Sequence, residues 1–599
     1  MGNTSRQPVI RLSALVLTTL FALPAGAASY TVKAGGGGDY ATIQACAGAT
    51  VAGDTCTVFA GTYDETVTPP TSGTAGQPIT FQANAGDAVT VRGFDLGNRS
   101  YVTIGGSAAN QGFEITGGNI SMTTPDHLVI QHNHIHDTSG RCIQDSTSAA
   151  SGPASFVTVL DNVLDFCGAG ASQGMIVEGD HWLIDGNTFS RVEDGIALYG
   201  DHHVLRNNHF GPVQVADVGP DVHPDAMESS CAGDFPLVRM LFENNVIQDW
   251  GPDDSNAHTF LLRDTLSCGQ TDQIIRFNAN INNGSYFAVI QTNSPNVRIY
   301  NNSISRTELA FGTKELEDLA FQEASPGGAA INNILADMTR ADTDTFCYWQ
   351  DDTSTTGFVG HHNLCFNTGS AGGWQSPPSG YAASDLFNLD PMFLDPTADL
   401  HLQTGSPAVG AGGPLTTVAS SDSGSGTALI VGDAGFFQDG YGIDGVQADW
   451  IRVGDTTTAE VASIDYVTNT LTLASSITRA PGDPVYLYKD SNGSVVLAGA
   501  SPEIGAYLNG EVGGSGTGGS GGSGVGGAGG GAAAGGTSGV GGSAGMAGAE
   551  PSDDGGCSCR AAGGRPAGHA ALGLLFASCA FVRRDRRRGR ARRTSDSRG

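Results

Sequence analysis

The chain has 599 residues, of which only 15% are charged, and it carries 88 glycines and a formal net charge of −31. Nine arginines lie after residue 582, so the chain before them is more acidic than the total indicates. This balance excludes a nucleic-acid partner, because phosphate binding requires a basic surface.

The first 28 residues have the organisation of a secretory signal. Arg6 and Arg11 precede the apolar run "LSALVLTTLFALPAGA", and small residues follow it. This pattern predicts a signal peptide over residues 1–28, cleaved after Ala27 or Ala28, and therefore an exported protein.

The mature chain opens with "GGDYATIQACAGATVAGDTCTVFAGTY". Residues 40–47 can form a short amphipathic helix with Ile43 facing the core. Such a helix would close the open end of a stacked structure, whose uncovered strands would otherwise invite edge-to-edge association.

A repeating phrase then runs along the chain: "LVIQHNHI", "VTVLDNVL", "WLIDGNTF", "HVLRNNHF", "MLFENNVI", "IIRFNANI", "VRIYNNSI", "AAINNILA" and a weaker "GHHNLCF". Each copy is β-branched and alternates in polarity before an asparagine, which favours a strand. A period in the twenties and thirties predicts a solenoid whose coils stack, with the asparagines in one internal or corner ladder. The aligned residues are Asn133, Asn162, Asn187, Asn208, Asn245, Asn280, Asn302, Asn333 and Asn363.

These repeats resemble the right-handed parallel β-helix of the pectin-lyase-like superfamily. The opening segment resembles that superfamily's N-terminal cap, and "DPMFLDPTADLHLQTGSPAVGAG" and "SPEIGAYLNG" resemble its closing coils. The resemblance implies an all-β fold, with a β-helix over residues 29–413 and a closing segment over 491–510. Alternation and turn residues between them predict a small inserted β-domain over residues 414–490.

Eight cysteines precede the tail and fall into sequential neighbours, an arrangement that an exported chain can use for disulfides. Two pairs are separated by 25 and 37 residues, about one coil, so their members can lie on adjacent rungs. A metal site built from these cysteines is disfavoured, since no pair has CxxC spacing. The pairs are Cys46 with Cys56, Cys142 with Cys167, Cys231 with Cys268, and Cys347 with Cys365.

Five further segments align as strands of one sheet: "QGMIVEG", "DGIALYG", "DAMESSC", "HTFLLRD" and "YFAVIQT". Period-two alternation points Met175, Ile196, Met227, Phe260, Val177, Leu198 and Leu262 inward. One outward column is then Glu178, Tyr199, Ser230, Arg263 and Gln291, and a second is Ile176, Ala197, Glu228, Leu261 and Val289. The corner column is Gln173, Asp194, Asp225, His258 and Tyr286.

Charged groups converge where these columns meet. We expect Asp194, Asp225, Glu228, His258 and Arg263 to be catalytic, and Glu178, Tyr199, His223 and Gln291 to bind substrate. Each also has a structural explanation: the aspartates can cap turn amides, and Arg263 can pair with Asp264 or Glu228. A second group, His132, His134 and His136, gives either a loose metal site or solvent-facing strand positions.

Three functions remain open at this stage. Elimination on a polyuronate would use Arg263 as base with His258 assisting, and Asp194, Asp225 and Glu228 holding Ca²⁺. Lysine, the base in several related lyase families, occurs before the insert only as Lys33 and Lys314, outside the aligned strands. Carboxylates on neighbouring rungs would instead suit glycoside hydrolysis. The third is a non-catalytic protein that binds glycan. The sequence favours cleavage of extracellular polysaccharide by a monomer.

The C-terminal region has the organisation of a targeting signal. Residues 511–556 are almost wholly Gly, Ser, Ala and Thr, a flexible linker. Cys557 and Cys559, an apolar run over residues 570–582 and the arginines follow. This order over residues 557–599 resembles the myxobacterial sorting signal MYXO-CTERM, which implies processing near the two cysteines and display at the cell surface. A simple tail anchor with cytoplasmic arginines is the alternative.

Overall fold

The structure is a computed structural model that describes residues 26–146, 153–170, 172–219, 224–229, 236–251, 257–264, 269–284, 286–291, 294–306, 316–321, 326–337, 345–350, 357–367 and 384–508. Most of the predicted signal peptide, the linker and the sorting segment lie outside these ranges. Among the described residues, no helix has the length and apolar character needed to cross a membrane.

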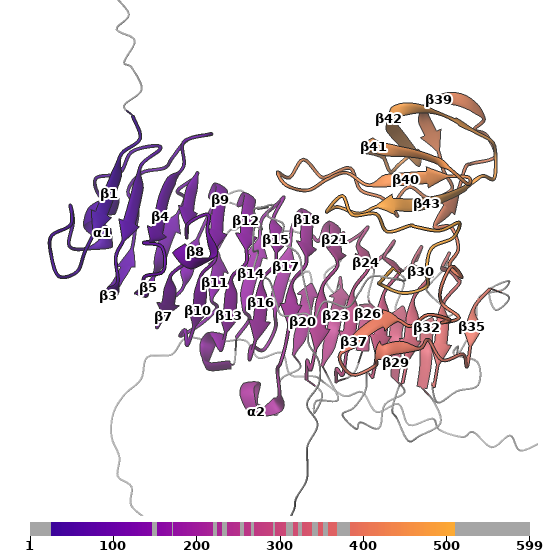
Figure 1. Ribbon diagram of the computed structural model, residues 1–599, viewed down its shortest axis with the longest axis horizontal. Helices are drawn as coiled ribbons and strands as arrows, with labels where there is room; N and C mark the ends of the chain where they lie inside the picture. The colour runs from indigo at the N-terminus through magenta and orange to yellow at the C-terminus, as the bar shows by residue number, and fades with distance from the viewer. Residues whose placement is uncertain are drawn as a thin grey trace, which may run out of the picture. The chain divides into compact units, whose positions relative to one another are not determined.

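Parallel strands dominate the fold, as the repeats predict. A thirteen-stranded sheet runs from β1 (Ser29–Val32) to β33 (Val359–His361), and each coil adds one strand, such as β9 (Asp126–Gln131) and β12 (Ser155–Leu160). Strands that are neighbours in the sheet belong to successive coils, so the chain winds once between them (Figure 1). This pairing defines a parallel β-helix and confirms the predicted fold class.

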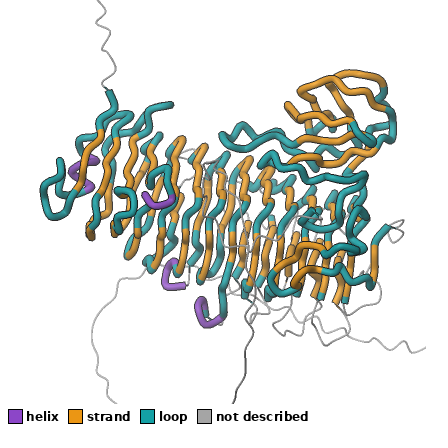
Figure 2. The backbone as a smooth tube through the Cα atoms, viewed as in Figure 1, coloured by secondary structure: helices purple, strands orange, loops and turns teal. Residues whose placement is uncertain are grey.

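The other large sheet consists of two rows of strands that merge near the N-terminal end. One row holds three-residue strands such as β10 (His134–His136) and β13 (Val163–Asp165), each placed directly after an asparagine. The other row holds the strands of the candidate site, including β17 (Ile196–Tyr199), β20 (Asp225–Ser229) and β23 (His258–Arg263). Figure 2 shows these rows as repeated strand segments joined by loops.

The asparagine ladder is buried and continuous. Each ladder residue donates from its backbone N–H and its Nδ2 to Oδ1 of the next, at 2.9–3.1 Å. Asp385 ends the ladder, accepting from the backbone N–H of Asn363 at 2.7 Å. The rung order through Asn187, Asn208 and Asn245 is the predicted one.

One rung of the predicted ladder is wrong: Asn278, not Asn280, occupies it. The residue before each ladder asparagine has a positive φ, and Phe277 (φ 56°) fills that position here. Asn280 lies two residues later, inside β25 (Ala279–Ile281), and accepts a hydrogen bond from Oγ1 of Thr259 at 2.6 Å. The phrase "FNAN" offers two asparagines, and only the turn geometry distinguishes them.

A short helix caps the N-terminal end, as predicted. Helix α1 spans Ile43–Ala47, and Ile43 is fully buried. The helix begins later than Tyr40 because Thr42 is its N-cap, whose side chain accepts from the backbone N–H of Ala45. The disulfide Cys46–Cys56 ties this helix to β2 (Thr55–Val58).

The disulfide Cys142–Cys167 confirms a second predicted pair. Cys365 is also disulfide-bonded, whereas the side chain of Cys347 is not described. Cys231 and Cys268 lie outside the described residues, so the pairing predicted for them stays a prediction.

Near the C-terminal end the chain forms a six-stranded antiparallel sheet between β38 (Thr416–Thr417) and β43 (Pro484–Lys489). Its apolar residues share a core cluster with Leu183, Val204 and Leu241 of the thirteen-stranded sheet. The inserted sheet therefore packs on that sheet, whereas the candidate site lies on another row of strands.

Candidate functional site

The site is built on three successive coils whose register matches the sequence alignment. Ile196 pairs with Met227, and Met227 with Phe260, which places Ala197, Glu228 and Leu261 in the neighbouring column. All seven residues predicted to point inward are fully buried, namely Met175, Val177, Ile196, Leu198, Met227, Phe260 and Leu262. The apolar alternation therefore fixes which side chains face outward.

Three corner residues form a chain of contacts across the coils. Asp194 lies just before β17, and its Oδ1 accepts from the backbone N–H of Asp225 at 3.1 Å. Asp225 Oδ1 lies 2.6 Å from Nδ1 of His258 on the next coil. Asp194 is 4% exposed and Asp225 0%, so both carboxyl groups lie beneath the surface that a substrate would contact.

Glu228 and Arg263 form the outward part of the cluster. Arg263 Nη2 donates to Glu228 Oε1 at 2.7 Å, and the arginine side chain is 34% exposed. Asp264 instead accepts from the backbone N–H groups of Gly269 and Gln270. Nε of Arg263 is buried and has no hydrogen-bond partner in the described structure. A buried donor without a protein acceptor is suited to an acceptor on a ligand.

The pKa of Asp194 reflects its burial and the repulsion between the carboxylates of the cluster. Burial, together with the nearby carboxylates of Asp225 and Glu228, raises the pKa of Asp194 well above its usual range. The amide of Gln173 donates to Asp194 at 3.1 Å and opposes this rise. The carboxyl group therefore resists ionisation unless a positive charge joins it.

The same three carboxylates are placed to hold a cation. One oxygen from each of Asp194, Asp225 and Glu228 lies within 4.8 Å of the others. An all-oxygen donor set suits Ca²⁺, which takes six to eight oxygens and would draw the remainder from water or substrate. Burial is the largest cause of the raised pKa of Asp194, and the crowding of these carboxylates adds to it. The residues present therefore fit Ca²⁺.

Arg141 extends the corner column by one coil, although the sequence alignment had omitted it. Arg141 Nε donates to Gln173 Oε1 at 2.8 Å, and this contact orients the amide that donates to Asp194. Ile143 pairs with Met175, so Arg141 stands in register with Gln173. The segment "RCIQD" has the alternation of the aligned strands and could have revealed it.

The structure describes the four predicted substrate-binding residues to different extents. Glu178 pairs with Tyr199 in register on the outward face, but Tyr199 is only 8% exposed because it packs with Ile176 and Ala197. Gln291 pairs with Arg263 by its backbone, as aligned, while its side chain is not described. His223 lies outside the described residues.

The Asp225–His258 pair has a defined chemical capacity. If Nδ1 of His258 carries the proton donated to Asp225, Nε2 is left as an acceptor, which a general base requires. Asp225 would then hold the ring in place and stabilise the imidazolium after proton transfer. Arg263 ends the same strand, and its guanidinium donates to Glu228, one carboxylate oxygen of which lies within 4.8 Å of an oxygen of Asp225.

No family model and no curated protein matches the chain. Among solved structures, an alginate lyase from Paenibacillus sp. is 12% identical, with 60% of this chain and 98% of that chain covered and a TM-score of 0.31. Pectate lyase Pel9A is 16% identical over 67% and 94%, with a TM-score of 0.35. A complex of XylC with xylose is 12% identical over 80% and 100%, with a TM-score of 0.37.

Proposed function

We propose that this chain is an exported parallel β-helix enzyme that cleaves an acidic polysaccharide by β-elimination. The observation that carries the proposal is the Asp225–His258 pair, which lies beside the Glu228–Arg263 pair on one outward row of strands. A carboxylate, an imidazole and a guanidinium on adjacent coils supply a base and positive charge within one site.

Burial favours elimination over hydrolysis. Glycoside hydrolysis needs two carboxyl groups on opposite sides of the sugar, about 5–9.5 Å apart, with both reaching the reacting atoms. Here Asp194 and Asp225 are almost fully buried, and one oxygen from each of Asp194, Asp225 and Glu228 lies within 4.8 Å of the others. These carboxylates are better placed to hold a cation and to orient His258 than to flank a glycosidic bond.

The chemistry of imidazole and guanidinium assigns the roles of His258 and Arg263. Arginine stays protonated at neutral pH, so His258 is the better base, and Arg263 is the better partner for the uronate carboxylate. His258 Nε2 takes the C5 proton, the C5–H electrons form the C4=C5 double bond, and the C4–O bond breaks. The departing oxygen is protonated by water or by the imidazolium of His258.

Calcium would be held by Asp194, Asp225 and Glu228, where it would supply charge neutralisation of the substrate carboxylate and so raise the acidity of C5–H. The protein residues keep their own tasks beside it. Gln173 and Arg141 hold Asp194 in place, and Asp225 holds the ring of His258.

The proposal also includes export of the enzyme and its display at the cell surface. Two disulfides, Cys46–Cys56 and Cys142–Cys167, support folding in an oxidising compartment. The predicted signal peptide over residues 1–28 and the sorting segment around Cys557 and Cys559 support transport to the cell surface. The polysaccharide would therefore be met outside the cell.

A panel of neutral and uronate-containing polysaccharides tests this function. Products are read in parallel as reducing ends and as absorbance of the unsaturated uronate. The proposal expects both signals to rise together on a uronate polymer, and to fall when Ca²⁺ is chelated. Reducing ends without unsaturation would establish hydrolysis, and retained binding without either signal would establish a glycan-binding protein.

A further inference from the structure

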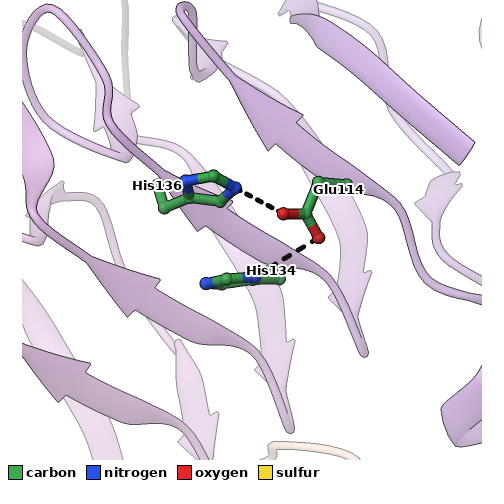
Figure 3. A group of neighbouring side chains, drawn as sticks. All are labelled: Glu114, His134 and His136. Carbon is green, nitrogen blue, oxygen red and sulfur yellow. Dashed lines mark hydrogen bonds and ion pairs between the residues drawn. The ribbon is translucent and has the colours of Figure 1, made fainter. Parts of the chain in front are cut away.

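A second polar cluster lies on the row of short strands, at earlier coils than the candidate site. Glu114 begins β7 (Glu114–Thr116), and His134 and His136 lie on β10, where His134 pairs with Glu114 in register. His134 and His136 are two residues apart on one strand, on either side of the buried Ile135, so both face outward. Figure 3 shows the carboxylate of Glu114 facing both imidazoles.

The donor atoms of the three side chains converge. His136 Nε2 lies 2.5 Å from Glu114 Oε1, and His134 Nδ1 lies 3.3 Å from Glu114 Oε2. The two imidazoles stack with their ring centroids 4.3 Å apart. One donor atom from each residue therefore lies within 4.8 Å of the others.

A fourth residue orients this cluster. Both ring nitrogens of His136 face carboxylates: Nδ1 lies 2.6 Å from Asp137 Oδ2, and Nε2 is directed at Glu114. A bound metal would take the place of the proton on Nε2, while Nδ1 would keep the proton donated to Asp137. A carboxylate behind a histidine fixes the tautomer in this way in metal sites and raises the basicity of the ligating nitrogen. His132 does not join the cluster, because its Nδ1 contacts the carbonyl oxygen of Gly106 at 2.9 Å.

We propose that Glu114, His134 and His136 form a binding site for Zn²⁺ or a similar divalent transition metal. Two imidazole nitrogens with one carboxylate oxygen match the donors that Zn²⁺ prefers, whereas Ca²⁺ prefers oxygen alone. Three protein ligands leave the fourth tetrahedral position open to water or to a ligand. This nitrogen-containing site is distinct from the all-oxygen cluster of Asp194, Asp225 and Glu228.

Modest side-chain movement suffices for binding. Metal–ligand bonds of about 2.0–2.1 Å in tetrahedral geometry put donor atoms about 3.3 Å apart, the present separation of His134 and Glu114. His136 Nε2 and Glu114 Oε1, now 2.5 Å apart, have to separate by about 0.8 Å on the same geometry. The Glu114 side chain is 43% exposed and can make that adjustment. A bound ion would link β7 to β10 and so stabilise two neighbouring coils.

The test is a calorimetric titration of the purified full-length protein with Zn²⁺ in the presence of excess Ca²⁺, which occupies oxygen-only sites. A double variant, His134→Gln with His136→Gln, should lose one binding site that the wild type has. His127→Gln is the matched control, because His127 also lies beside a carboxylate, at 2.9 Å from Asp126, but belongs to no cluster of metal ligands among the residues that the structure describes. It should keep the wild-type stoichiometry.

Two single variants keep the test decisive if the double variant folds poorly. Glu114→Gln should weaken Zn²⁺ binding at this site at least about tenfold, and Asp137→Asn should weaken it about tenfold or more through the orientation of His136. Wild-type affinity in Glu114→Gln, or no Zn²⁺ binding by the wild type beyond that of the double variant, would overturn the proposal. Circular dichroism without metal confirms that each variant is folded.

Discussion

The carboxyl group of Asp225 is fully buried, yet it contacts His258, which lies on the proposed catalytic surface. In the proposed mechanism, Asp225 therefore positions the imidazole, while His258 meets the substrate. Asp194 lies one coil further back and accepts from the backbone of Asp225. At the scale of single residues, hydrogen bonds link the buried Asp194 and Asp225 to His258 on the next coil.

Replacing Asp225 with Asn should lower turnover by about two orders of magnitude or more, because the amide no longer holds His258 in the basic tautomer. Initial rates of unsaturated product on the polymer identified by the panel measure this change. His202→Gln is the control, since His202 also contacts an aspartate, Asp201 at 2.8 Å, on a different row of strands. Equal losses in the two variants would mean that Asp225 acts through the general fold.

The raised pKa of Asp194 predicts a pH-dependent response to calcium. The folded protein holds this proton more tightly than the unfolded chain, so the contribution to stability is present below the unfolded pKa and is lost as pH rises through the raised folded pKa. Ionisation of the cluster at rising pH therefore opposes folding, and Ca²⁺ should relieve this opposition. At a hundredfold excess over Kd the gain is about 2.7 kcal/mol.

Thermal unfolding with and without Ca²⁺ measures this response. The increase in melting temperature should be larger at about pH 7 than at about pH 4, because protonated carboxyl groups bind cations poorly. Asp194→Asn should reduce the increase at neutral pH. A calcium response that is independent of pH and of Asp194 would place the ion elsewhere.

Among the elements, the asparagine ladder determines the register of the coils. Each ladder amide donates to its neighbour and also to a backbone carbonyl of the preceding coil, such as Asn208 Nδ2 to the carbonyl oxygen of Ile184 at 2.9 Å. The residue before each ladder position has a positive φ, so the turn and the hydrogen bonds recur together. The short strand of the next row starts immediately after each turn.

Asn208→Leu should reduce the free energy of unfolding by about 1–3 kcal/mol, because Asn187 and Asn245 each lose a buried partner. Asn110→Leu, at an exposed position outside the ladder, should change it little. Urea unfolding monitored by circular dichroism compares the two. Similar stabilities for both variants would mean that the ladder is dispensable.

Much of the β-helix could be predicted from the sequence, since its strands and turns recur as local sequence repeats. Period-two alternation correctly aligned Met175, Ile196, Met227 and Phe260 across four coils. The choice between Asn278 and Asn280 could not be made, because it depends on the φ of Phe277 and not on residue type. The burial of Tyr199 was also beyond reach, since it packs with Ile176 of the neighbouring coil and with Ala197 of its own strand.

At the scale of the whole β-helix and insert, the decisive contact is an ion-pair network between distant parts of the chain. Arg276 is fully buried and donates to Glu243 at 2.7 Å, to both oxygens of Asp449 at 2.8 Å, and to the hydroxyl of Tyr300 at 2.9 Å. Asp449 belongs to the inserted segment, 173 residues away in sequence. Sequence periodicity carries no information about such a contact.

Replacing Arg276 with Met should destabilise the protein by about 3–5 kcal/mol, because Glu243 and Asp449 remain buried without their partner. Limited proteolysis should then cut first around the insert. Arg92→Met, which removes an exposed pair with Asp64, should cost less than about 1 kcal/mol. Equal stability of the two variants would show that the insert is held by its apolar contacts alone.

The central claim is that His258, held by Asp225, performs elimination on a uronate polymer, and the masses of the cleaved oligosaccharides test it most directly. The account predicts that wild-type protein with Ca²⁺ releases fragments whose new non-reducing ends are lighter by one water than hydrolysis products. It also predicts that His258→Gln, with an unchanged fold, releases almost none. Fragments that have gained water, or unsaturated fragments released at the wild-type rate by His258→Gln, would contradict it.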